Sequence, residues 1–324
     1  MQWGIIGPGN IAHDFANDLQ YVETKQCSVG PVLGHKPEHT KAFAEKYNGS
    51  SATNTIEEFI YAKPDAVYIA TPHPLHHQQA LICLENKIPV LCEKPLAINA
   101  QQVTELVDAS KKNNTFLLEG MWSRFLPSFQ FLFQIIQSNT IGKILHLHAD
   151  MSFIAQKDKS NRFFNPELGG GSLLDVGVYT IYLSYFLLGN PDEIFAAGKL
   201  TEQHIDETCG IMLKYKNGNF ATLASSIITQ TEGSAWLYGS DGTICIKKPW
   251  TETPEKIEVI INNESSFKHI PSWPGRGFQY EVEEVIKCLN EKRIESEIVP
   301  HRASLDVIKI MDTVREQLGI IYPV

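Results

Sequence analysis

The sequence predicts two domains: an N-terminal α/β domain on a parallel sheet and a C-terminal α+β domain on a large, mainly antiparallel open sheet. At 324 residues the chain exceeds the size at which a single hydrophobic core usually continues to grow. Strand-like and helical segments alternate over the first 118 residues, which is typical of a parallel sheet with helical crossovers. Beyond that point strand-like segments follow one another across short loops, which favours antiparallel pairing.

The N-terminal domain is expected to span residues 1–118. Its first strand and first helix are separated by a glycine turn, because the apolar run over 2–6 ends at Gly7-Pro8-Gly9 and apolar residues then recur at helical spacing. Right-handed crossovers are expected between the strands that follow. The expected strands are 2–6, 28–33, 66–70, 89–92 and 115–118, and the expected helices are 11–19, 38–47, 75–85 and 100–112.

The C-terminal domain is expected to span residues 119–324. Its strand candidates alternate with turn residues, and three helical segments interrupt or close the sheet. The expected strands are 144–153, 193–199, 208–215, 219–228, 234–239, 242–247 and 256–261, and the expected helices are 173–188, 278–289 and 303–318.

Composition narrows the class of protein. The formal net charge is -9 and no run of five Lys or Arg occurs, so neither nucleic acid nor an anionic membrane surface is an expected partner. No apolar run reaches the length of about 18 residues that a membrane span needs, and we expect a cytoplasmic protein. The six cysteines contain no CxxC pair and are expected to be free thiols.

The glycine turn carries the first chemical signal. Gly7-Pro8-Gly9-Asn10-Ile11-Ala12 matches the G-x-G-x-x-A pattern between a strand and a helix. Gly7 makes the turn, and Gly9 lets the backbone approach a pyrophosphate. The phosphates of a dinucleotide would lie against the amides at the start of the helix, including those of Asn10 and Ile11.

The end of the second strand indicates which dinucleotide is bound. A carboxylate here usually accepts a hydrogen bond from the ribose of NAD, whereas a basic residue accommodates the 2′-phosphate of NADP. No carboxylate precedes Glu38, and His35 and Lys36 stand at this place. We expect a preference for NADP; a solvated basic loop is the alternative.

Two further loops should lie at the same edge of the sheet. Thr71, Pro72, His73 and His76 follow the third strand, where their backbone would line the cofactor crevice. The histidines do not form a convincing zinc site, because zinc needs further ligands at fixed spacing, so no metal is expected. Glu93-Lys94-Pro95 follows the next strand and would bring Lys94 beside the nicotinamide, unless it is an ordinary surface lysine.

A second glycine loop opens a helix in the C-terminal domain. Gly169-Gly170-Gly171 precedes the helical segment in which Asp175 and Tyr179 lie four residues apart. One helical face could present both side chains to a ligand. The alternative is a flexible loop followed by a tyrosine packed in the core.

Taken together, these motifs resemble the glucose-fructose oxidoreductase, inositol dehydrogenase and rhizopine-catabolism (Gfo/Idh/MocA) family over essentially the full length. The segment 119–127 and the C-terminal Gly319-Ile320-Ile321-Tyr322-Pro323 look like the dimeric dihydrodiol dehydrogenases and the related NADP-dependent D-xylose dehydrogenases. Many family members carry histidine where this chain has Tyr179, and this subgroup carries tyrosine. The chain departs from the subgroup at His35-Lys36, where an arginine is common, so dual use of NAD and NADP stays open.

The resemblance implies a Rossmann domain, a second domain whose open sheet mediates homodimerisation, and a substrate pocket between the two domains. The residues implied for that pocket are Lys94, Trp122, Arg124, Asp175 and Tyr179. Phe153 and Trp122 would form an apolar wall; core packing is an equal alternative for Phe153.

The expected reaction is reversible hydride transfer between the nicotinamide and a sugar, polyol or cyclic trans-diol, with oxidation at CH-OH. Tyr179 is the candidate general base, because a phenol of pKa about 10 becomes usable when an ammonium group such as that of Lys94 favours the phenolate. The roles of Lys94 and Tyr179 could be exchanged. Asp175 would orient Lys94 or a substrate hydroxyl.

Two other functions remain open on the same fold. One is reduction of an imine, pyrroline or biliverdin-like substrate, which would use basic residues such as Arg124, Arg162 and Arg276 to hold substrate carboxylates. The other is a non-catalytic NADP-binding sensor, which would have no need for Lys94 and Tyr179 together.

Overall fold

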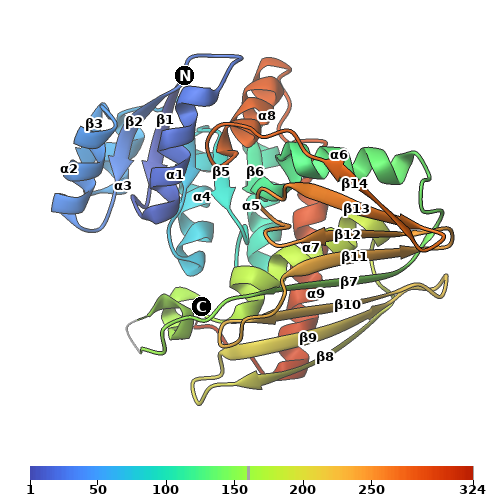
Figure 1. Ribbon diagram of the computed structural model, residues 1–324. Coiled ribbons are helices and arrows are strands. Elements are labelled where there is room, and N and C mark those ends of the chain that lie inside the picture. The colour runs from blue at the N-terminus through green and yellow to red at the C-terminus, as the bar shows by residue number, and fades with distance from the viewer. Residues whose placement is uncertain (159–160, 324) are drawn as a thin grey trace. The chain divides into compact units, whose positions relative to one another are not determined.

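A computed structural model describes residues 1–158 and 161–323. The chain forms two compact units (Figure 1). Unit 1 comprises Met1–Phe125 and Trp273–Leu305, and unit 2 comprises Leu126–Ser272 and Asp306–Val324. The first unit therefore extends past the expected boundary at 118/119 and also includes a segment from the C-terminal part of the chain.

Unit 1 is built on a six-stranded parallel sheet in the order β3-β2-β1-β4-β5-β6. This is the classic Rossmann strand order, which reverses direction at β1 and leaves a ligand crevice at the carboxyl ends of β1 and β4. The expected strands are confirmed, and the structure adds one short strand. The strands are β1 (Gln2–Ile6), β2 (Ser28–Leu33), β3 (Ser51–Thr53), β4 (Ala66–Ile69), β5 (Val90–Glu93) and β6 (Leu117–Gly120).

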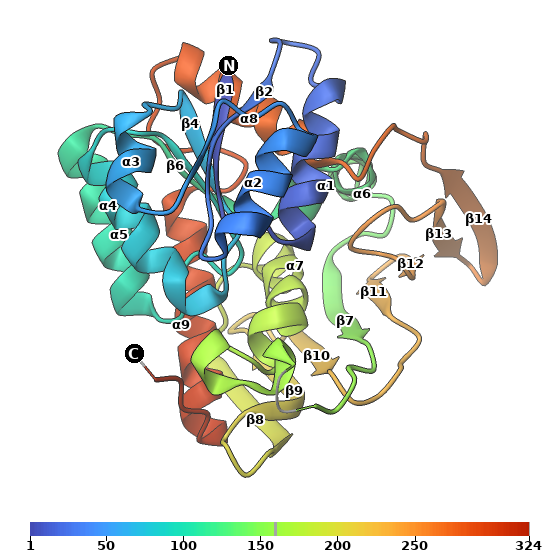
Figure 2. The ribbon, with the colours of Figure 1, turned by 90° about the vertical axis from the view of Figure 1, so that its left-hand side faces the viewer.

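Helices cover both faces of this sheet, with α1 and α2 on one side and α3, α4 and α5 on the other (Figure 2). The expected helices are confirmed within one or two residues. The helices of unit 1 are α1 (Asn10–Asp18), α2 (Pro37–Lys46), α3 (Ile56–Tyr61), α4 (His76–Glu85), α5 (Ala100–Asn113) and α8 (Phe278–Asn290), with single turns η1 (Leu19–Tyr21), η2 (His73–Leu75) and η3 (Trp122–Phe125).

The helix α8 corrects one expectation, because it packs on the Rossmann sheet and does not close the second sheet. Phe15 of α1 stacks on Tyr68 of β4 at a centroid distance of 3.8 Å, and Phe278 meets Phe15 edge-on at 6.2 Å. Asp18, at the end of α1, accepts hydrogen bonds from the amides of Arg276, Gly277 and Phe278 at 2.8, 2.8 and 3.0 Å. These contacts join segments some 260 residues apart, and local periodicity does not report such pairing.

Unit 2 is built on an eight-stranded sheet in the order β14-β13-β12-β11-β7-β10-β9-β8. The expected, mainly antiparallel character is confirmed, although β7 and β10 pair in parallel. The strands are β7 (Ile144–Ser152), β8 (Glu193–Leu200), β9 (Asp206–Lys214), β10 (Phe220–Ser226), β11 (Ser234–Gly239), β12 (Thr243–Lys247), β13 (Lys256–Ile261) and β14 (Glu264–His269).

The expected helix over 173–188 has two parts in the structure. Its first five residues, Leu173–Gly177, form a π-helical turn, and the α-helix begins at Val178. Such turns are rare and occur frequently at functional sites. The helical elements beside this sheet are α6 (Pro127–Gln137), η4 (Arg162–Phe164), η5 (Pro166–Leu168), η6 (Leu173–Gly177), α7 (Val178–Leu188) and α9 (His301–Leu318), whose first turn belongs to unit 1.

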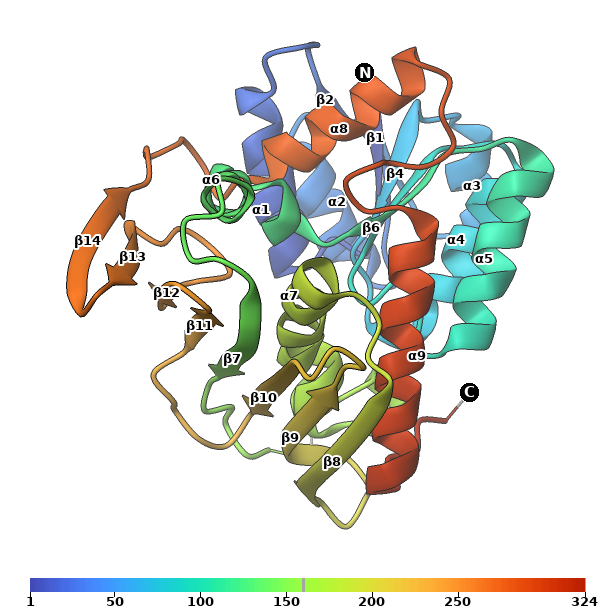
Figure 3. The same ribbon diagram turned by 90° about the vertical axis from the view of Figure 1, so that its right-hand side faces the viewer.

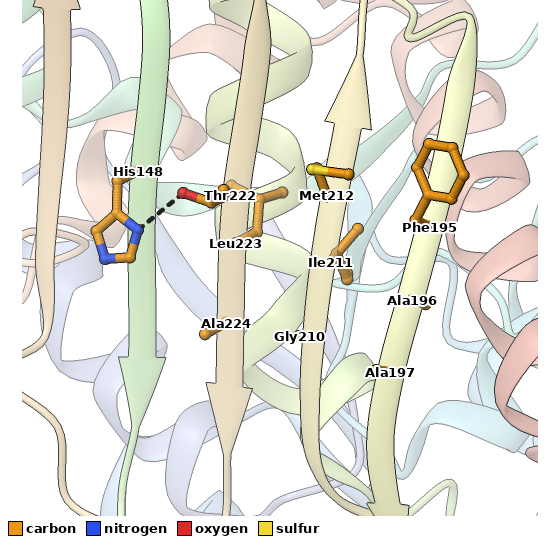
Figure 4. Close-up of a pocket in the computed structure, with 10 residues that line it drawn as sticks. All are labelled: His148, Phe195, Ala196, Ala197, Gly210, Ile211, Met212, Thr222, Leu223 and Ala224. Carbon is orange, nitrogen blue, oxygen red and sulfur yellow. Dashed lines mark hydrogen bonds between the residues drawn. The ribbon is translucent and has the colours of Figure 1, made fainter.

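The two faces of the second sheet differ. Helix α7 lies along one face (Figure 3), where Leu147, Leu213 and Leu237 are fully buried. On the opposite face Phe195 and Met212 are 46% and 43% exposed. They face one another across β8 and β9, and beside them His148 and Thr222 approach within 3.0 Å (Figure 4). A shallow hollow of about 440 Å³ lies over these strands.

One helical stretch, Pro166–Leu188, is long and apolar enough to pass the length and composition test for a membrane span. Such a stretch was not expected from the sequence. In the structure 72% of the most apolar 18-residue part of this stretch is buried inside the protein, as in the core helix of a globular unit.

A buried acid in unit 1 gives a stability prediction. Glu281 of α8 is fully buried, and neither of its carboxyl oxygens has a hydrogen-bond partner among the described residues. Burial, and then the nearby carboxyls of Glu93 and Asp18, raise the pKa of Glu281 well above its usual value of 4.5. Because the folded state then holds a proton that the unfolded state releases, stability falls as the pH rises above about 4.5.

Glu281→Gln should therefore raise Tm at pH 8 by about 2–6 °C, with a smaller gain at pH 5. Thermal unfolding followed by circular dichroism at both pH values measures this difference. Glu57→Gln, on the exposed face of α3, is the control and should leave Tm unchanged at both pH values. An equal gain at pH 5 and pH 8 would show that Glu281 does not titrate in this range.

Candidate active site

The glycine turn has the geometry that a dinucleotide pyrophosphate requires. The Gly7 amide donates to the Leu33 carbonyl at 2.9 Å. Gly7 has φ +87°, and a Cβ here would lie 2.7 Å from Cγ2 of Thr71. Gly9 is the exposed N-cap of α1, and a Cβ there would meet nothing within 4 Å. Gly7 is therefore needed to shape the turn, whereas Gly9 leaves open space at the helix N-terminus, where an anion is favoured.

The neighbouring residues of this turn complete the phosphate-binding surface. Asn10 and Ile11 are exposed in the first turn of α1, where amide groups have no partner within a helix. Pro8 is half-buried, and its ring packs closely on Gly34 just after β2. A Cβ on Gly34 would lie only 2.9 Å from that ring. His35 and Lys36, which directly follow Gly34, are exposed. The structure thus brings the expected phosphate turn and the expected basic residues to the same corner of the sheet.

The loop after β4 contains both surface and buried positions. Thr71 and Pro72 are half-buried at the carboxyl edge of the sheet, and His73 is 6% exposed. His76 is fully buried, and its ring nitrogens lie 2.8 Å from the carbonyl oxygens of Thr71 and Pro95.

Burial lowers the pKa of His76. Because a neutral imidazole donates only one hydrogen bond, it holds one of these carbonyls at a time. The His76 ring thus lies between the loops after β4 and β5, inside the unit. The described residues contain no group of three or more metal-ligating side chains.

The loop after β5 places Lys94 and Glu93 differently. Lys94 is half-buried at the carboxyl edge of the sheet. Glu93 is 8% exposed and accepts a hydrogen bond from the Tyr68 hydroxyl at 2.5 Å. Burial raises the pKa of Glu93, and the positive charge of Lys94 opposes that rise. The Glu93 side chain therefore points toward Tyr68 inside unit 1, so a role for it in cofactor binding would depend on its backbone.

Glu119, which was not among the predicted site residues, holds this loop by a hydrogen bond. Its Oε1 accepts a hydrogen bond from the Leu96 amide at 2.9 Å, two residues after Lys94. Glu119 is 4% exposed on β6, directly opposite Cys92 of β5. The sequence does contain a clue to this role, because Glu119 stands in an otherwise apolar strand. A carboxylate in such a place is usually buried only when it accepts hydrogen bonds.

Trp122 and Arg124 lie in η3, at the end of unit 1's N-terminal segment. The Trp122 ring stacks on Phe278 at 5.2 Å and is 8% exposed, so much of its area packs inside the unit. Burial lowers the pKa of Arg124 to about 10, which leaves its guanidinium charged near neutrality.

Unit 2 carries the other expected catalytic residues on the helix after the second glycine loop. Asp175 is 8% exposed in η6, and Tyr179 is 9% exposed in the first turn of α7. The Oδ1 of Asp175 accepts a hydrogen bond from Arg162 at 2.8 Å. The guanidinium of Arg162 in turn lies 4.1 Å from the Phe163 ring centroid.

Phe153 belongs to the same neighbourhood of unit 2. Its ring meets Phe163 edge-on at 4.8 Å, and both pack on a small cluster of Ala155, Phe164 and Ile227. Phe153 is half-buried, so part of its surface remains accessible. Packing in this cluster accounts for its conformation, and a contact with substrate stays a prediction.

Each unit therefore gathers its own group of candidate residues. In unit 1 the glycine turn, Thr71 and Lys94 follow β1, β4 and β5, which are adjacent in the sheet, so their side chains share one edge. In unit 2 Asp175 and Tyr179 share the start of one helix. The first group fits a dinucleotide, and the second offers a carboxylate and a phenol.

This fold and the phosphate turn define a dinucleotide-binding protein. A family model described as the oxidoreductase family with an NAD-binding Rossmann fold matches residues 1–121, and one described as the GFO/IDH/MocA C-terminal domain matches residues 129–245. The chain belongs to this GFO/IDH/MocA family.

Curated relatives match over nearly the full length. The trans-1,2-dihydrobenzene-1,2-diol dehydrogenase of Xenopus tropicalis is 33% identical, over 99% of this chain and 99% of its own. The scyllo-inositol 2-dehydrogenase (NADP(+)) IolU of Bacillus subtilis (strain 168) is 32% identical, over 100% of this chain and 98% of its own.

Solved structures share the fold at lower identity. An aldose-aldose oxidoreductase from Caulobacter crescentus superposes with a TM-score of 0.88 at 20% identity, over 98% of this chain and 97% of its own. A levoglucosan dehydrogenase in complex with NADH and levoglucosan superposes with a TM-score of 0.87 at 19% identity, with the same coverage.

Proposed function

We propose that this protein is an NADP-preferring dehydrogenase that oxidises a CH-OH group of a sugar, polyol or cyclic trans-diol, in a reversible reaction. The observation that carries the proposal is the position of Lys94, directly after β5 at the edge where the glycine turn lies. In Rossmann domains the dinucleotide extends along this edge, from the ribose at the end of β2 past the turn after β1. An ammonium group at the end of β5 is therefore available to an oxygen that reacts beside the nicotinamide.

The protein residues have two tasks in this reaction. The bound nicotinamide supplies the chemistry by accepting or returning a hydride. Lys94 would polarise the reacting oxygen, and Tyr179 would accept its proton, because an oriented ammonium favours both the alkoxide and the phenolate. Asp175, held by Arg162, would orient a substrate hydroxyl. The exchange of roles between Lys94 and Tyr179 remains part of the proposal.

The substrate class follows from the residues offered and from the names of relatives. Relatives are named for a dihydrodiol and an inositol, and a structural neighbour for levoglucosan. All three are cyclic and carry hydroxyl groups. Partly accessible aromatic surface at Phe153 suits the apolar face of such a ring, and Asp175 suits its hydroxyls.

The direct test is oxidation of a substrate panel by the purified protein, followed at 340 nm with NADP and NAD in parallel. The panel contains D-xylose, D-glucose, inositols and trans-dihydrodiols. We expect turnover with at least one of these compounds and a higher kcat/KM with NADP. Binding of NADPH without any turnover would contradict the proposal and would favour an imine reductase or a sensor.

Cofactor preference should depend on Lys36. Reversing its charge with Lys36→Glu should raise KM for NADP by about tenfold or more and change KM for NAD much less, because only NADP carries the 2′-phosphate. Lys63→Glu, on an exposed loop before β4, is the matched control and should change neither value. Equal effects on both cofactors would argue against Lys36 as the phosphate ligand.

We further propose that two copies associate through the open face of the second sheet. Exposed apolar side chains such as Phe195 and Met212 gather there over a shallow hollow (Figure 4). Contiguous exposed apolar surface of this kind is typical of protein interfaces.

The described cysteines are unpaired, which supports a reducing compartment, and we propose that the protein is located in the cytoplasm.

Met212→Glu should convert the dimer to a monomer. In a two-fold interface the substitution acts twice, and two carboxylates would be brought into an apolar contact. Size-exclusion chromatography with light scattering measures the mass. Tyr61→Glu, at an 86% exposed position on unit 1, is the control and should leave the dimer intact. A wild-type monomer at micromolar concentration would exclude this interface.

A further inference from the structure

Asp206 lies at the start of β9 and bonds to the beginning of the helix that carries Asp175 and Tyr179. Its side chain is fully buried. Its Oδ2 accepts hydrogen bonds from the Ser172 hydroxyl at 2.6 Å and from the Leu173 amide at 2.7 Å. Leu173 is the first residue of η6, so Asp206 supplies an acceptor to an amide that has no partner within the helix. A negative charge at this end of a helix is also favourable.

The glycine loop is shaped to allow this contact. Gly171 has φ +112°, and a Cβ there would overlap the Oδ1 of Asp206. A Cβ on Gly170 would lie 2.8 Å from the Arg162 carbonyl oxygen and 2.7 Å from that of Phe163. Both glycines are therefore required by close packing, on Asp206 at one side and on the turn that holds Arg162 at the other. The glycine loop is therefore closely packed on both sides, although its composition would also suit a flexible linker.

The surroundings of Asp206 leave its charge poorly compensated. Burial raises the pKa of Asp206 to about 6. Among the described residues, Oδ1 has no hydrogen-bond partner, nor does the buried hydroxyl of Tyr322. The Tyr322 phenol and the Cys209 thiol are the titratable groups that face it, and both have a raised pKa through burial first and the Asp206 charge second. The Arg315 guanidinium lies 5.3 Å from the Tyr322 ring centroid.

The adjacent carboxylate, Glu207, has the opposite environment. Lys157 and Lys199 lie 2.8 and 2.7 Å from its two oxygens. Hydrogen bonds from these lysines lower the pKa of Glu207. Neither Glu207 oxygen bonds to the glycine loop or to η6 in the described contacts, which makes Glu207 a matched control for Asp206.

We propose that Asp206 is a positioning residue that holds the π-helical turn through Ser172 and the Leu173 amide, and thereby sets the orientation of Asp175 and Tyr179. The proposal rests on the proposed function for its kinetic consequence. When Asp206 takes up a proton, its oxygens become weaker acceptors and the charge at the helix start is lost. The helix start should then loosen, and kcat should fall as the pH drops through about 6.

The kinetic test compares Asp206→Asn, Asp206→Ala and Glu207→Gln from pH 5 to pH 8, with the best substrate of the panel and saturating NADP. Asparagine keeps the carbonyl acceptor without the charge, so kcat at pH 8 should fall by roughly tenfold, against roughly a hundredfold for alanine. The Asn variant should also lose the fall in kcat near pH 6, while Glu207→Gln retains it. Kd for NADPH, measured by fluorescence, should stay unchanged in all three.

A second readout does not depend on turnover. Hydrogen exchange of peptides that cover Leu173–Tyr179, compared at one pH, should be faster in Asp206→Asn than in the wild type and unchanged in Glu207→Gln. A wild-type protein that turns over no panel substrate would contradict the proposed function. Faster exchange in Asp206→Asn would still support the role of Asp206 in holding the start of the helix. Wild-type exchange, kcat and pH profile in Asp206→Asn would overturn the role of Asp206, whatever the reaction.

Discussion

Lys94→Ala, Tyr179→Phe and the double variant are expected to lower kcat by similar factors, about 10²–10⁴, because in the proposed mechanism the two groups serve one proton transfer. If they act as proposed, loss of either group disables that transfer, so the second substitution should add little. NADPH binding should persist in all three, since the phosphate turn and the loop after β4 are untouched. Steady-state kinetics and fluorescence titration with NADPH measure both quantities.

The controls for this experiment lie on the same elements or on the same unit. Tyr182→Phe removes a hydroxyl from the next turn of α7, and Lys111→Ala removes an exposed ammonium from α5. Both should keep wild-type kcat. Losses that multiply in the double variant would show that Lys94 and Tyr179 act independently. Full turnover in either single variant would remove that residue from the mechanism.

Gly9→Ala and Gly7→Ala should separate cofactor binding from folding. A Cβ on Gly9 meets no protein atom, and its extended backbone suits any residue, so Tm should change by no more than about 2 °C. The same Cβ would project toward the bound pyrophosphate. Kd for NADPH should therefore rise at least about tenfold, equivalent to about 1.4 kcal/mol.

Gly7→Ala should act mainly on stability. At φ +87° a Cβ would lie 2.9 Å from the backbone carbonyl of Ala70, which cannot move without disturbing β4. We expect Tm to fall by about 5–10 °C. Differential scanning calorimetry with and without NADPH distinguishes the two variants. A large loss of Tm in Gly9→Ala, with wild-type NADPH affinity, would contradict the assignment of this turn to the phosphates.

The sequence alone was sufficient for the Rossmann order of elements and for the glycine turn. Buried parallel strands are short continuous apolar runs, and the expected strand over 28–33 matches β2. The two missed strands lack such a signal: β3 has three residues, and β14 is exposed throughout. Two helices were missed as well, the six-residue α3 and the apolar α6. The place of Lys94 at the end of a strand and that of Tyr179 in the helix after a glycine loop were also predicted, because each residue follows a local motif.

Only the tertiary structure decided which side chains meet across the chain. Glu93 follows an apolar strand, as a cofactor ligand could, but Tyr68 holds its carboxyl inside unit 1. Asp206 and Ser172 are 34 residues apart, and no periodicity connects them. The Phe278 amide donates a hydrogen bond to Asp18, 260 residues earlier in the chain, and this contact helps to place α8 on the Rossmann sheet.

The physical reason is the range of the interactions. Turns, strands and helices follow from local sterics and from the period of apolar residues, which a sequence displays directly. The partner of a buried polar group is decided by the packing of whole elements, because most such groups bond to a donor or acceptor that the fold brings near them.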